Sequence, residues 1–545
     1  IGVARRPCPP KCGKLAPKRF LRRRRYGLPL CRRRSQRSIA PPKQHRVQRA
    51  RSITLPAIVA AARSDPSTLL AQPVQHLGRL HTAQPVDVPA DSHTRSAQVS
   101  ILIYHAVEKP RDGNPPFPIL RLISPTMMRR VAMRRIACIA AWVLGMAMAA
   151  NAAPIPLQRG VGVHGWLNWS PMEDDGSYRW PPYRSEKEWR AGDRPLTNWP
   201  DGEAFASIRS MGFDFVRLSV DPGPLLASEG AKRQQALDIL AAAVERVTSA
   251  GLKVVFDLHG VTQVPAYSME MIYDGADSGG VASYREMVVS VATMLVKIGT
   301  DKVALEPYNE PAYYPCDSSG SDDWQRIMAG TVRDIRSVSS ELTIVATGAC
   351  GDSIAGLVNL TPGFDDPNLY YSFHMYEPHS FTHQRSDGID AFASGLPWPA
   401  DSSTPEVVTE TLKAQMDAAG LSPVEQVMNM VAAREAIARY FEQNWGPSQL
   451  EASFRQAVDW AEAHGVPSRR LFMGEFGVIL MSADGRMGAF DADRLRYLKA
   501  VREQAERFAI PWSVWEFSNP YGMTVIRQEG PAVPDSKMLR ALGLP

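Results

Sequence analysis

Val303-Ala304-Leu305-Glu306-Pro307-Tyr308-Asn309-Glu310-Pro311 joins a short apolar run to a polar tripeptide. The apolar run is typical of a buried strand, and Glu310 follows it closely. A second run, Leu471-Phe472-Met473-Gly474-Glu475-Phe476-Gly477, has the same form and carries Glu475 at its end. Two glutamates at the carboxyl ends of strands suit acid–base cleavage of a glycosidic bond, because one carboxyl must be protonated and the other ionised.

Runs of this kind recur along the chain and alternate with amphipathic helical patterns. The predicted strands are Gly160–Trp166, Phe213–Val220, Lys253–His259, Val303–Tyr308, Thr343–Thr347, Leu369–Met375, Leu471–Glu475 and Trp512–Phe517. The predicted helices between them include Lys232–Ala250, Val281–Ile298, Asp322–Val338, Pro423–Asn444, Gln449–His464 and Asp491–Phe508. Eight strands, each followed by a helix, predict an α/β fold of the (β/α)8 TIM barrel type. A doubly wound sheet is the alternative, but no Gly-rich phosphate loop follows the first strand.

Two connections are too long for simple turns. They follow the first and sixth strands, at Leu167–Pro200 and from Glu377 to about Thr404, and both are rich in aromatic residues. Loops that follow strands lie on the catalytic face of a barrel, so their tryptophans could stack on sugar rings. The alternative is that these tryptophans only pack their own loops.

The chain before the barrel differs in composition. Residues 1–126 hold 24 Lys/Arg against 5 Asp/Glu and show no sustained apolar periodicity. They are expected to be disordered, and to be non-native upstream sequence, since Met127 opens the pattern of a signal peptide over 127–152. A nucleic-acid or membrane-binding arm is the other interpretation of such a basic segment. The predicted catalytic domain is therefore 153–545, and a chain that starts at Ala153 should fold unaided.

The net charge of this domain indicates which partners it can have, and the preceding signal peptide indicates its location. Without residues 1–152 the net charge changes from +6 to −17, which argues against nucleic acid as a partner. A signal peptide predicts a secreted or periplasmic protein without stable membrane association after cleavage, and we expect a monomer. Cys316 and Cys350 are the only cysteines of the domain, and barrel geometry places them on neighbouring loops. We predict that they form a disulfide, with two unpaired buried cysteines as the alternative.

Polar residues gather at the predicted strand ends, where barrel enzymes place their chemistry. They are Arg217, His259, Asn309, Glu310, His374, Tyr376, Glu475 and Trp515. Each has a structural alternative: Arg217 could form a plain ion pair, and Tyr376 and Trp515 could be core aromatics. His259 and His374 could bind a metal, but no Asp/His cluster with ligand spacing accompanies them, so no cofactor is predicted.

These stretches resemble glycoside hydrolase family 5. The matching segments are Phe215-Val216-Arg217-Leu218, Asp257-Leu258-His259-Gly260, Glu306 to Pro311, Ser372-Phe373-His374-Met375-Tyr376, Gly474-Glu475-Phe476-Gly477 and Val514-Trp515-Glu516. They occur in the family's order and span residues 155–520.

The resemblance implies a retaining mechanism, with Glu310 as the acid/base and Glu475 as the nucleophile. It implies that Arg217 and Tyr376 keep Glu475 ionised, and that an apolar, like-charged setting raises the pKa of Glu310. The other implied substrate-binding residues are His259, Asn309, His374, Trp515 and Trp166. The resemblance also suggests carboxyl groups about 5–5.5 Å apart and a cis peptide bond after Trp515.

The implied function is that of an exported endo-β-1,4-glucanase, whose partner is a β-glucan or a related polysaccharide. A β-mannanase, a β-1,3-glucanase and a glycolipid-directed enzyme remain alternatives within the family. A barrel that binds glycans without cleaving them and a metal-dependent barrel hydrolase are alternatives from other classes.

Overall fold

The computed structural model describes residues 153–191, 202–314, 321–362, 364, 366–384, 394–481, 488–519, 522–527 and 532–545. The predicted disordered segment (1–126) and signal peptide (127–152) lie outside these residues, so both stay predictions. Among the described residues, no helix combines the length and apolar character needed to cross a membrane.

Eight parallel strands close into a barrel in chain order, which confirms the predicted (β/α)8 fold. The strands are β1 (Arg159–Leu167), β2 (Phe215–Val220), β3 (Lys253–Leu258), β4 (Val303–Glu306), β5 (Thr343–Ala346), β6 (Leu369–Met375), β7 (Leu471–Phe476) and β8 (Trp512–Val514). All eight lie within two residues of the predicted starts. The predicted fourth strand is too long at its end, because Pro307 has no N–H to donate to a neighbouring strand.

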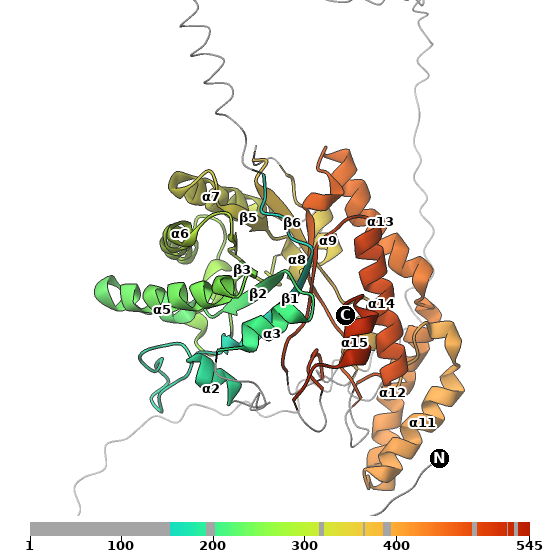
Figure 1. The fold of residues 1–545 in the computed structure, drawn as a ribbon. Helices are drawn as coiled ribbons and strands as arrows, with labels where there is room; N and C mark the ends of the chain where they lie inside the picture. The colour runs from blue at the N-terminus through green and yellow to red at the C-terminus, as the bar shows by residue number, and fades with distance from the viewer. Residues whose placement is uncertain are drawn as a thin grey trace, which may run out of the picture. The chain divides into compact units, whose positions relative to one another are not determined.

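Helices surround this barrel. The longer ones are α5 (Gly230–Ser249), α6 (Gly279–Ile298), α7 (Asp323–Val338), α11 (Pro405–Ala418), α12 (Pro423–Gln443), α13 (Pro447–Ala463) and α14 (Asp491–Arg507). The shorter ones are α2 (Glu186–Arg190), α3 (Ala204–Ser210), α4 (Gly223–Leu226), α8 (Ala349–Asp352), α9 (Ile354–Val358), α10 (His379–Thr382) and α15 (Ser536–Ala541). Single 3₁₀ turns are η3 (Pro265–Tyr267), η4 (Met269–Ile272), η5 (Ala400–Ser402) and η6 (Ser468–Arg470). Helices α5, α6 and α7 lie side by side along one side of the barrel, and α13 and α14 pack together on another (Figure 1).

Helix α11 was missed by the sequence prediction. It lies between the long connection predicted to end near Thr404 and the helix predicted to begin at Pro423. The hydroxyl of Thr404 accepts a hydrogen bond from the Val407 N–H, and Pro405 occupies the first turn. Both are ordinary start signals of a helix, so this helix could have been predicted. Helices α11 and α12 pack against each other within the long excursion that follows β6.

The amino end of the barrel is closed by an apolar plug. Ile155 and Leu157, which precede β1, pack against inward-facing residues near the starts of the strands, among them Phe215, Val255, Ala304, Val345, Tyr370 and Phe472. Each such fully buried large side chain stabilises the fold by about 1.5–3 kcal/mol. Because this end is filled by apolar side chains, polar side chains inside the barrel gather at the opposite, carboxyl end.

Candidate active site

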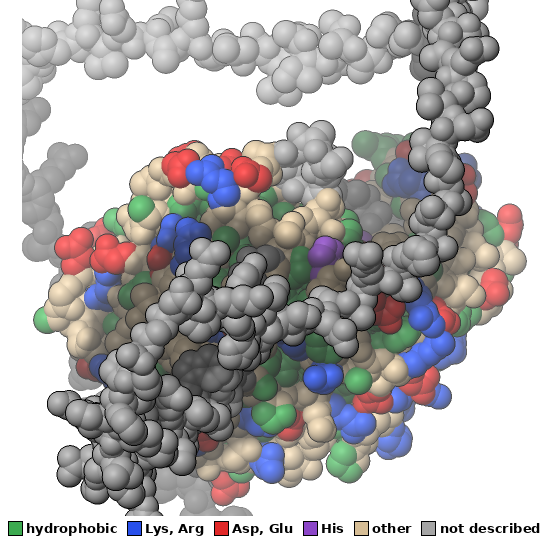
Figure 2. All heavy atoms as spheres, turned by 90° about the horizontal axis from the view of Figure 1, so that it is seen from above, with side chains coloured by type: hydrophobic (Ala, Val, Ile, Leu, Met, Phe, Trp, Pro, Cys, Tyr) green, Lys and Arg blue, Asp and Glu red, His purple; other side chains and the backbone are tan. Residues whose placement is uncertain are grey.

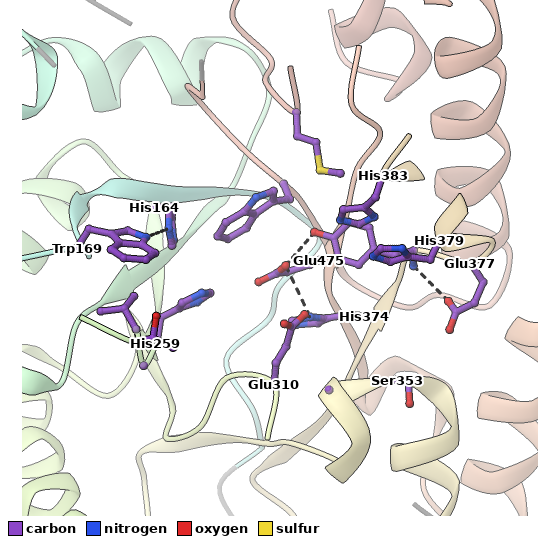
Figure 3. Close-up of a pocket in the computed structure, with 17 residues that line it drawn as sticks. His164, Trp169, His259, Glu310, Ser353, His374, Glu377, His379, His383 and Glu475 are labelled. Atoms are coloured by element: carbon purple, nitrogen blue, oxygen red, sulfur yellow. Dashed lines mark hydrogen bonds and ion pairs between the residues drawn. The ribbon is translucent and has the colours of Figure 1, made fainter. Parts of the chain in front are cut away.

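A cavity of about 760 Å³ opens at the carboxyl ends of the strands. Residues that lie at the ends of β1, β6 and β7 or follow β1, β3, β4, β5, β6 and β8 line it. Six of the predicted site residues are among them: His259, Glu310, His374, Tyr376, Glu475 and Trp515. Figure 3 shows that the labelled Glu310, His374 and Glu475 point toward one another, with His164 and His259 across the opening. In the space-filling view a histidine side chain is visible at the surface of one face (Figure 2).

Arg217, on β2, organises the floor of this cavity. Its fully buried guanidinium donates to both carboxylate oxygens of Glu306, at 2.7 and 3.0 Å. It also donates to Oε1 of Glu475 at 2.6 Å and to Oδ1 of Asn309 at 2.9 Å. Burial alone would lower the pKa of Arg217, but Asp257, Glu306 and Glu475 raise it well above its usual value. The arginine is thus a permanent cation that holds two glutamates and the asparagine in fixed positions.

Glu475, on β7, is held by hydrogen bonds to both of its oxygens. Arg217 donates to Oε1, and the hydroxyl of Tyr376 donates to Oε2 at 2.9 Å. The side chain is 6% exposed, so water does not compete freely for these bonds. The arrangement fixes the carboxylate with one edge toward the cavity, as a nucleophile requires.

Glu310 follows β4 and faces Glu475. Its φ of 42° lies in the left-handed region, and its side chain is 41% exposed. Nδ1 of His374 lies 2.7 Å from Oε1 of Glu310 and 3.7 Å from Oε2 of Glu475. One oxygen of each glutamate lies within 4.8 Å of the other. This upper limit on the distance between the two oxygens is compatible with the carboxyl separation of about 5–5.5 Å that retaining hydrolases use.

The pKa of Glu310 differs from the sequence-based expectation. Burial pushes this pKa up, but the hydrogen bond and charge of His374 act more strongly together and lower it. Burial acts against the charge on His374, yet Glu475, Asp352 and Glu310 raise its pKa to about 10. In the resting site His374 and Glu310 therefore share one proton, which lies on His374, while Glu310 is ionised.

The opposite wall is built from histidines and an indole. His259 Nδ1 lies 2.8 Å from Oδ2 of Asp257, and its ring stacks on Trp515 at a centroid distance of 5.7 Å and 16°. Burial lowers the pKa of His259, but Asp257 overcomes this effect and the net shift is upward. The peptide bond between Trp515 and Glu516 is cis, as predicted. Trp515 borders the cavity, where its ring can form a floor for a sugar.

The expectation for Trp166 is corrected by the structure. Trp166 is 4% exposed and stacks on Trp189 at 5.7 Å, and its indole N–H donates to the carbonyl of Arg184. It does not border the cavity. In a regular strand Trp166 would share a face with His164, two residues earlier, but the register of β1 against β2 shifts between Val163 and Leu167, so the alternation is broken and Trp166 points into a core between strand and loop.

The aromatic and titratable residues that line the cavity without having been among the predicted site residues are His164, Trp169, Glu377, His379 and His383. His164 could have been found, since it is a polar residue inside an apolar predicted strand. Trp169 lies in the long first loop, 45% exposed, and donates from its indole to Nε2 of His164 at 3.1 Å. The other three follow β6, where loop conformation rather than a sequence pattern decides which side chains turn inward.

Two groups of possible metal ligands occur among the described residues. They are Glu306, Asp352 and His374, and Glu310, His374 and Glu475. Arg217 already neutralises Glu306 and Glu475, and the raised pKa of His374 favours an imidazolium that has no lone pair for a metal. The donors therefore suit an ion-pair network, and we assign no metal to either group.

The structure describes only one of the two cysteines of the predicted disulfide. Cys350 is disulfide-bonded. Its predicted partner, Cys316, lies outside the described residues, so the pairing stays a prediction.

Glu516 offers a test of the electrostatics beside this site. Burial raises its pKa to about 8, against an ordinary value near 4.5 in the unfolded chain, although hydrogen bonds from Asn519 and the His164 N–H oppose this. A raised carboxyl pKa contributes stability that is complete below the unfolded pKa and is lost as the pH rises through the folded one. We expect Glu516→Gln to remove a decline of about 1.4 kcal/mol per pH unit between pH 4.5 and 8. Urea unfolding of both proteins at pH 5, 6.5 and 8 measures this, and parallel stability profiles would refute it.

The chain is similar to known proteins at the level of both sequence and structure. A sequence model of the family described as Cellulase (glycosyl hydrolase family 5) matches residues 186–520, more than half of the chain. Endoglucanase 3 of Fibrobacter succinogenes is 26% identical over 201 residues, which cover 37% of this chain and only 27% of that protein. Cellodextrinase A of Ruminococcus flavefaciens is 23% identical over 322 residues, which cover 58% of this chain and 77% of that protein. Among solved structures, the Clostridial cellulose synthase subunit Z (CcsZ) from Clostridioides difficile is 21% identical, with a TM-score of 0.47, covering 71% of this chain and 99% of that one.

Proposed function

Because this chain belongs to the cellulase family of glycosyl hydrolases, glycosyl hydrolase family 5, we propose that it is an exported, retaining endo-β-1,4-glucanase. Membership of the family makes it an O-glycosyl hydrolase. The substrate, the mode of attack, the residue roles and the location are the parts that we propose.

The observation that carries the proposal is the close approach of Glu310 and Glu475 across the cavity. In the first step, the Glu475 carboxylate attacks the sugar carbon while Glu310 gives its proton to the leaving glycosidic oxygen. In the second, Glu310 takes a proton from water, and the resulting hydroxide releases the sugar from Glu475. Two displacements at one carbon preserve the β configuration.

The remaining cavity residues have roles that follow from their positions. Trp515, whose ring stacks on His259, borders the cavity beside the two carboxylates, and the face of its indole suits the face of a sugar ring. Asn309 is fixed by Arg217 and lies 3.3 Å from Nε2 of His259 through its amide nitrogen. Asn309 is 7% exposed and does not itself line the cavity, so the group that we propose for a sugar hydroxyl is the second N–H of its amide, beside Glu310. The signal-like segment that precedes residues 153–545 supports export.

The experiment that tests the function is reducing-end release from a panel of barley β-glucan, carboxymethylcellulose, mannan, xyloglucan and laminarin. We expect the highest rate on a β-1,4-linked glucan, with a rapid fall in viscosity that marks internal cleavage. Proton NMR of the first product should show the β anomer. A highest rate on mannan or laminarin would reassign the substrate, and an α anomer would refute retention. Binding without release of reducing ends would favour the glycan-binding alternative.

A further inference from the structure

Asp352 is a fully buried carboxyl group to which the proposed mechanism gives no task. It lies at the end of α8, in the connection between β5 and β6. Its Oδ1 accepts a hydrogen bond from the Gly348 N–H at 3.1 Å, and Oδ2 accepts one from the Ser372 hydroxyl at 2.6 Å. Oδ2 also lies 3.3 Å from Nε2 of His374. The carboxylate is thus fixed by two donors with one oxygen against the histidine.

His374 links Asp352 to the acid/base. The ring is 2% exposed, and its two nitrogens face opposite ways: Nε2 toward Asp352 and Nδ1 toward Glu310. The contact of Nε2 with Asp352 lacks the alignment of a hydrogen bond, and among the described residues Nε2 has no other hydrogen-bond partner. The interaction is therefore mainly one of charge, and it acts on the same imidazole that hydrogen-bonds to Glu310.

We propose that Asp352 is a positioning residue that sets where the proton shared by His374 and Glu310 resides, an inference that rests on the proposed function. An ionised Asp352 favours the imidazolium and keeps the proton on Nδ1. For the first chemical step, this proton moves to Oε1 of Glu310, leaving a neutral imidazole with its Nε2–H toward Asp352. Glu310 then passes the proton to the glycosidic oxygen. Water returns one proton in the second step, so the count balances over the cycle.

Asp352 itself titrates near neutrality, mainly because it is buried. Burial raises the pKa of Asp352 to about 7, and the charge of Glu306 on β4 adds to this, while His374 and Ser372 on β6 and the Gly348 N–H oppose it. On its other side, the imidazole faces Glu310 and Glu475. As Asp352 ionises with rising pH, its negative charge makes it harder to remove the proton that His374 and Glu310 share.

The test is the pH profile of kcat/KM for Asp352→Asn on barley β-glucan. Asparagine keeps the shape and can still accept from Gly348, but it carries no charge. Because a neighbouring opposite charge within about 4–6 Å shifts a pKa by 1–3 units, the alkaline limb should move about one pH unit lower. A purely structural role would lower the rate at all pH values without moving this limb. An unchanged alkaline limb would overturn the proposal.

A matched control and a second substrate separate this inference from the proposed function. Asp221 is also fully buried and accepts from the Gly223 and Ser170 N–H groups, so Asp221→Asn makes the same change away from His374 and should leave the limb in place. With 2,4-dinitrophenyl β-cellobioside, whose leaving group needs no proton, wild type and Asp352→Asn should react at equal rates on the alkaline side. A wild-type protein that is inactive on both substrates would refute the proposed function. If the wild-type protein is active and its alkaline limb lies at the same pH as that of Asp352→Asn, only the role of Asp352 is refuted.

If thermal unfolding shows that Asp352→Asn does not fold, the pH profile of Ser372→Ala provides the second measurement. Removing the hydroxyl takes away a donor to Oδ2 and makes ionisation of Asp352 harder. The alkaline limb should then move in the same direction by a smaller amount. A limb that stays at the wild-type pH in Ser372→Ala would overturn the proposal.

Discussion

Glu475→Gln should lower kcat on a β-1,4-glucan by on the order of 10⁴-fold or more, because an amide oxygen does not attack the sugar carbon. Glutamine has the size of glutamate and can still accept the hydrogen bond from Arg217, so the fold and substrate binding should persist. The measurement is kcat from reducing-end release, together with the Kd of a cello-oligosaccharide by calorimetry. We expect the loss almost entirely in kcat.

A matched control is Glu435→Gln, which makes the same chemical change on an exposed glutamate of α12 and should leave kcat unchanged. Hydrolysis by Glu475→Gln within tenfold of wild type would exclude Glu475 as the nucleophile. A variant that neither binds oligosaccharide nor unfolds cooperatively would instead report a damaged site, and circular dichroism distinguishes the two.

Arg217→Lys should destabilise the protein by about 3–5 kcal/mol and also reduce activity strongly. The guanidinium reaches Glu306, Glu475 and Asn309 at once, and a single ammonium on a shorter chain cannot reproduce this fork. The carboxylates that lose their partner remain buried, which is where most of the destabilisation comes from. Urea unfolding at pH 7 gives the free energy of unfolding, and kcat is measured well below the unfolding midpoint.

Arg494→Lys is the matched control, because Arg494 is also fully buried but donates to backbone carbonyls of Val478 and Thr524, outside the cavity. It should lose stability while kcat of the folded fraction stays near wild type. If Arg217→Lys behaved in the same way, Arg217 would be a structural ion pair without influence on the reacting groups.

The barrel could be predicted from the sequence because each strand is a compact apolar run whose period differs from that of the helices around it. Glu310 and Glu475 were found by the same rule, since a parallel barrel brings all carboxyl ends of its strands to one rim. This rule needs only the strand boundaries, and it tolerates errors of two residues.

Features that depend on side-chain direction were harder to predict. Trp166 lies near the end of β1, two residues after His164, yet it turns into the core, because the register of β1 against β2 shifts between Val163 and Leu167 and the sequence does not reveal this irregularity. The pKa of Glu310 depends on His374, which lies 64 residues away in sequence and contributes a hydrogen bond that no motif reveals. Asp352 belongs to a loop without periodicity, so only the folded chain shows that it faces the imidazole.

The ion-pair network around Arg217 has a consequence for the field inside the cavity. Five carboxyl groups (Asp257, Glu306, Glu310, Asp352 and Glu475) surround one guanidinium and the imidazoles of His259 and His374. Even when Asp352 is protonated, four carboxyl groups face three basic groups, and all four except Glu310 are nearly shielded from water, so the potential at the sugar carbon favours positive charge. A sugar that loses its leaving group passes through an oxocarbenium-like state with positive charge on the ring, which this fixed field stabilises without reorganisation. Under the proposed function, the same field should repel a sugar that carries its own carboxylate, so we expect faster cleavage of neutral glycans than of polyuronic acids.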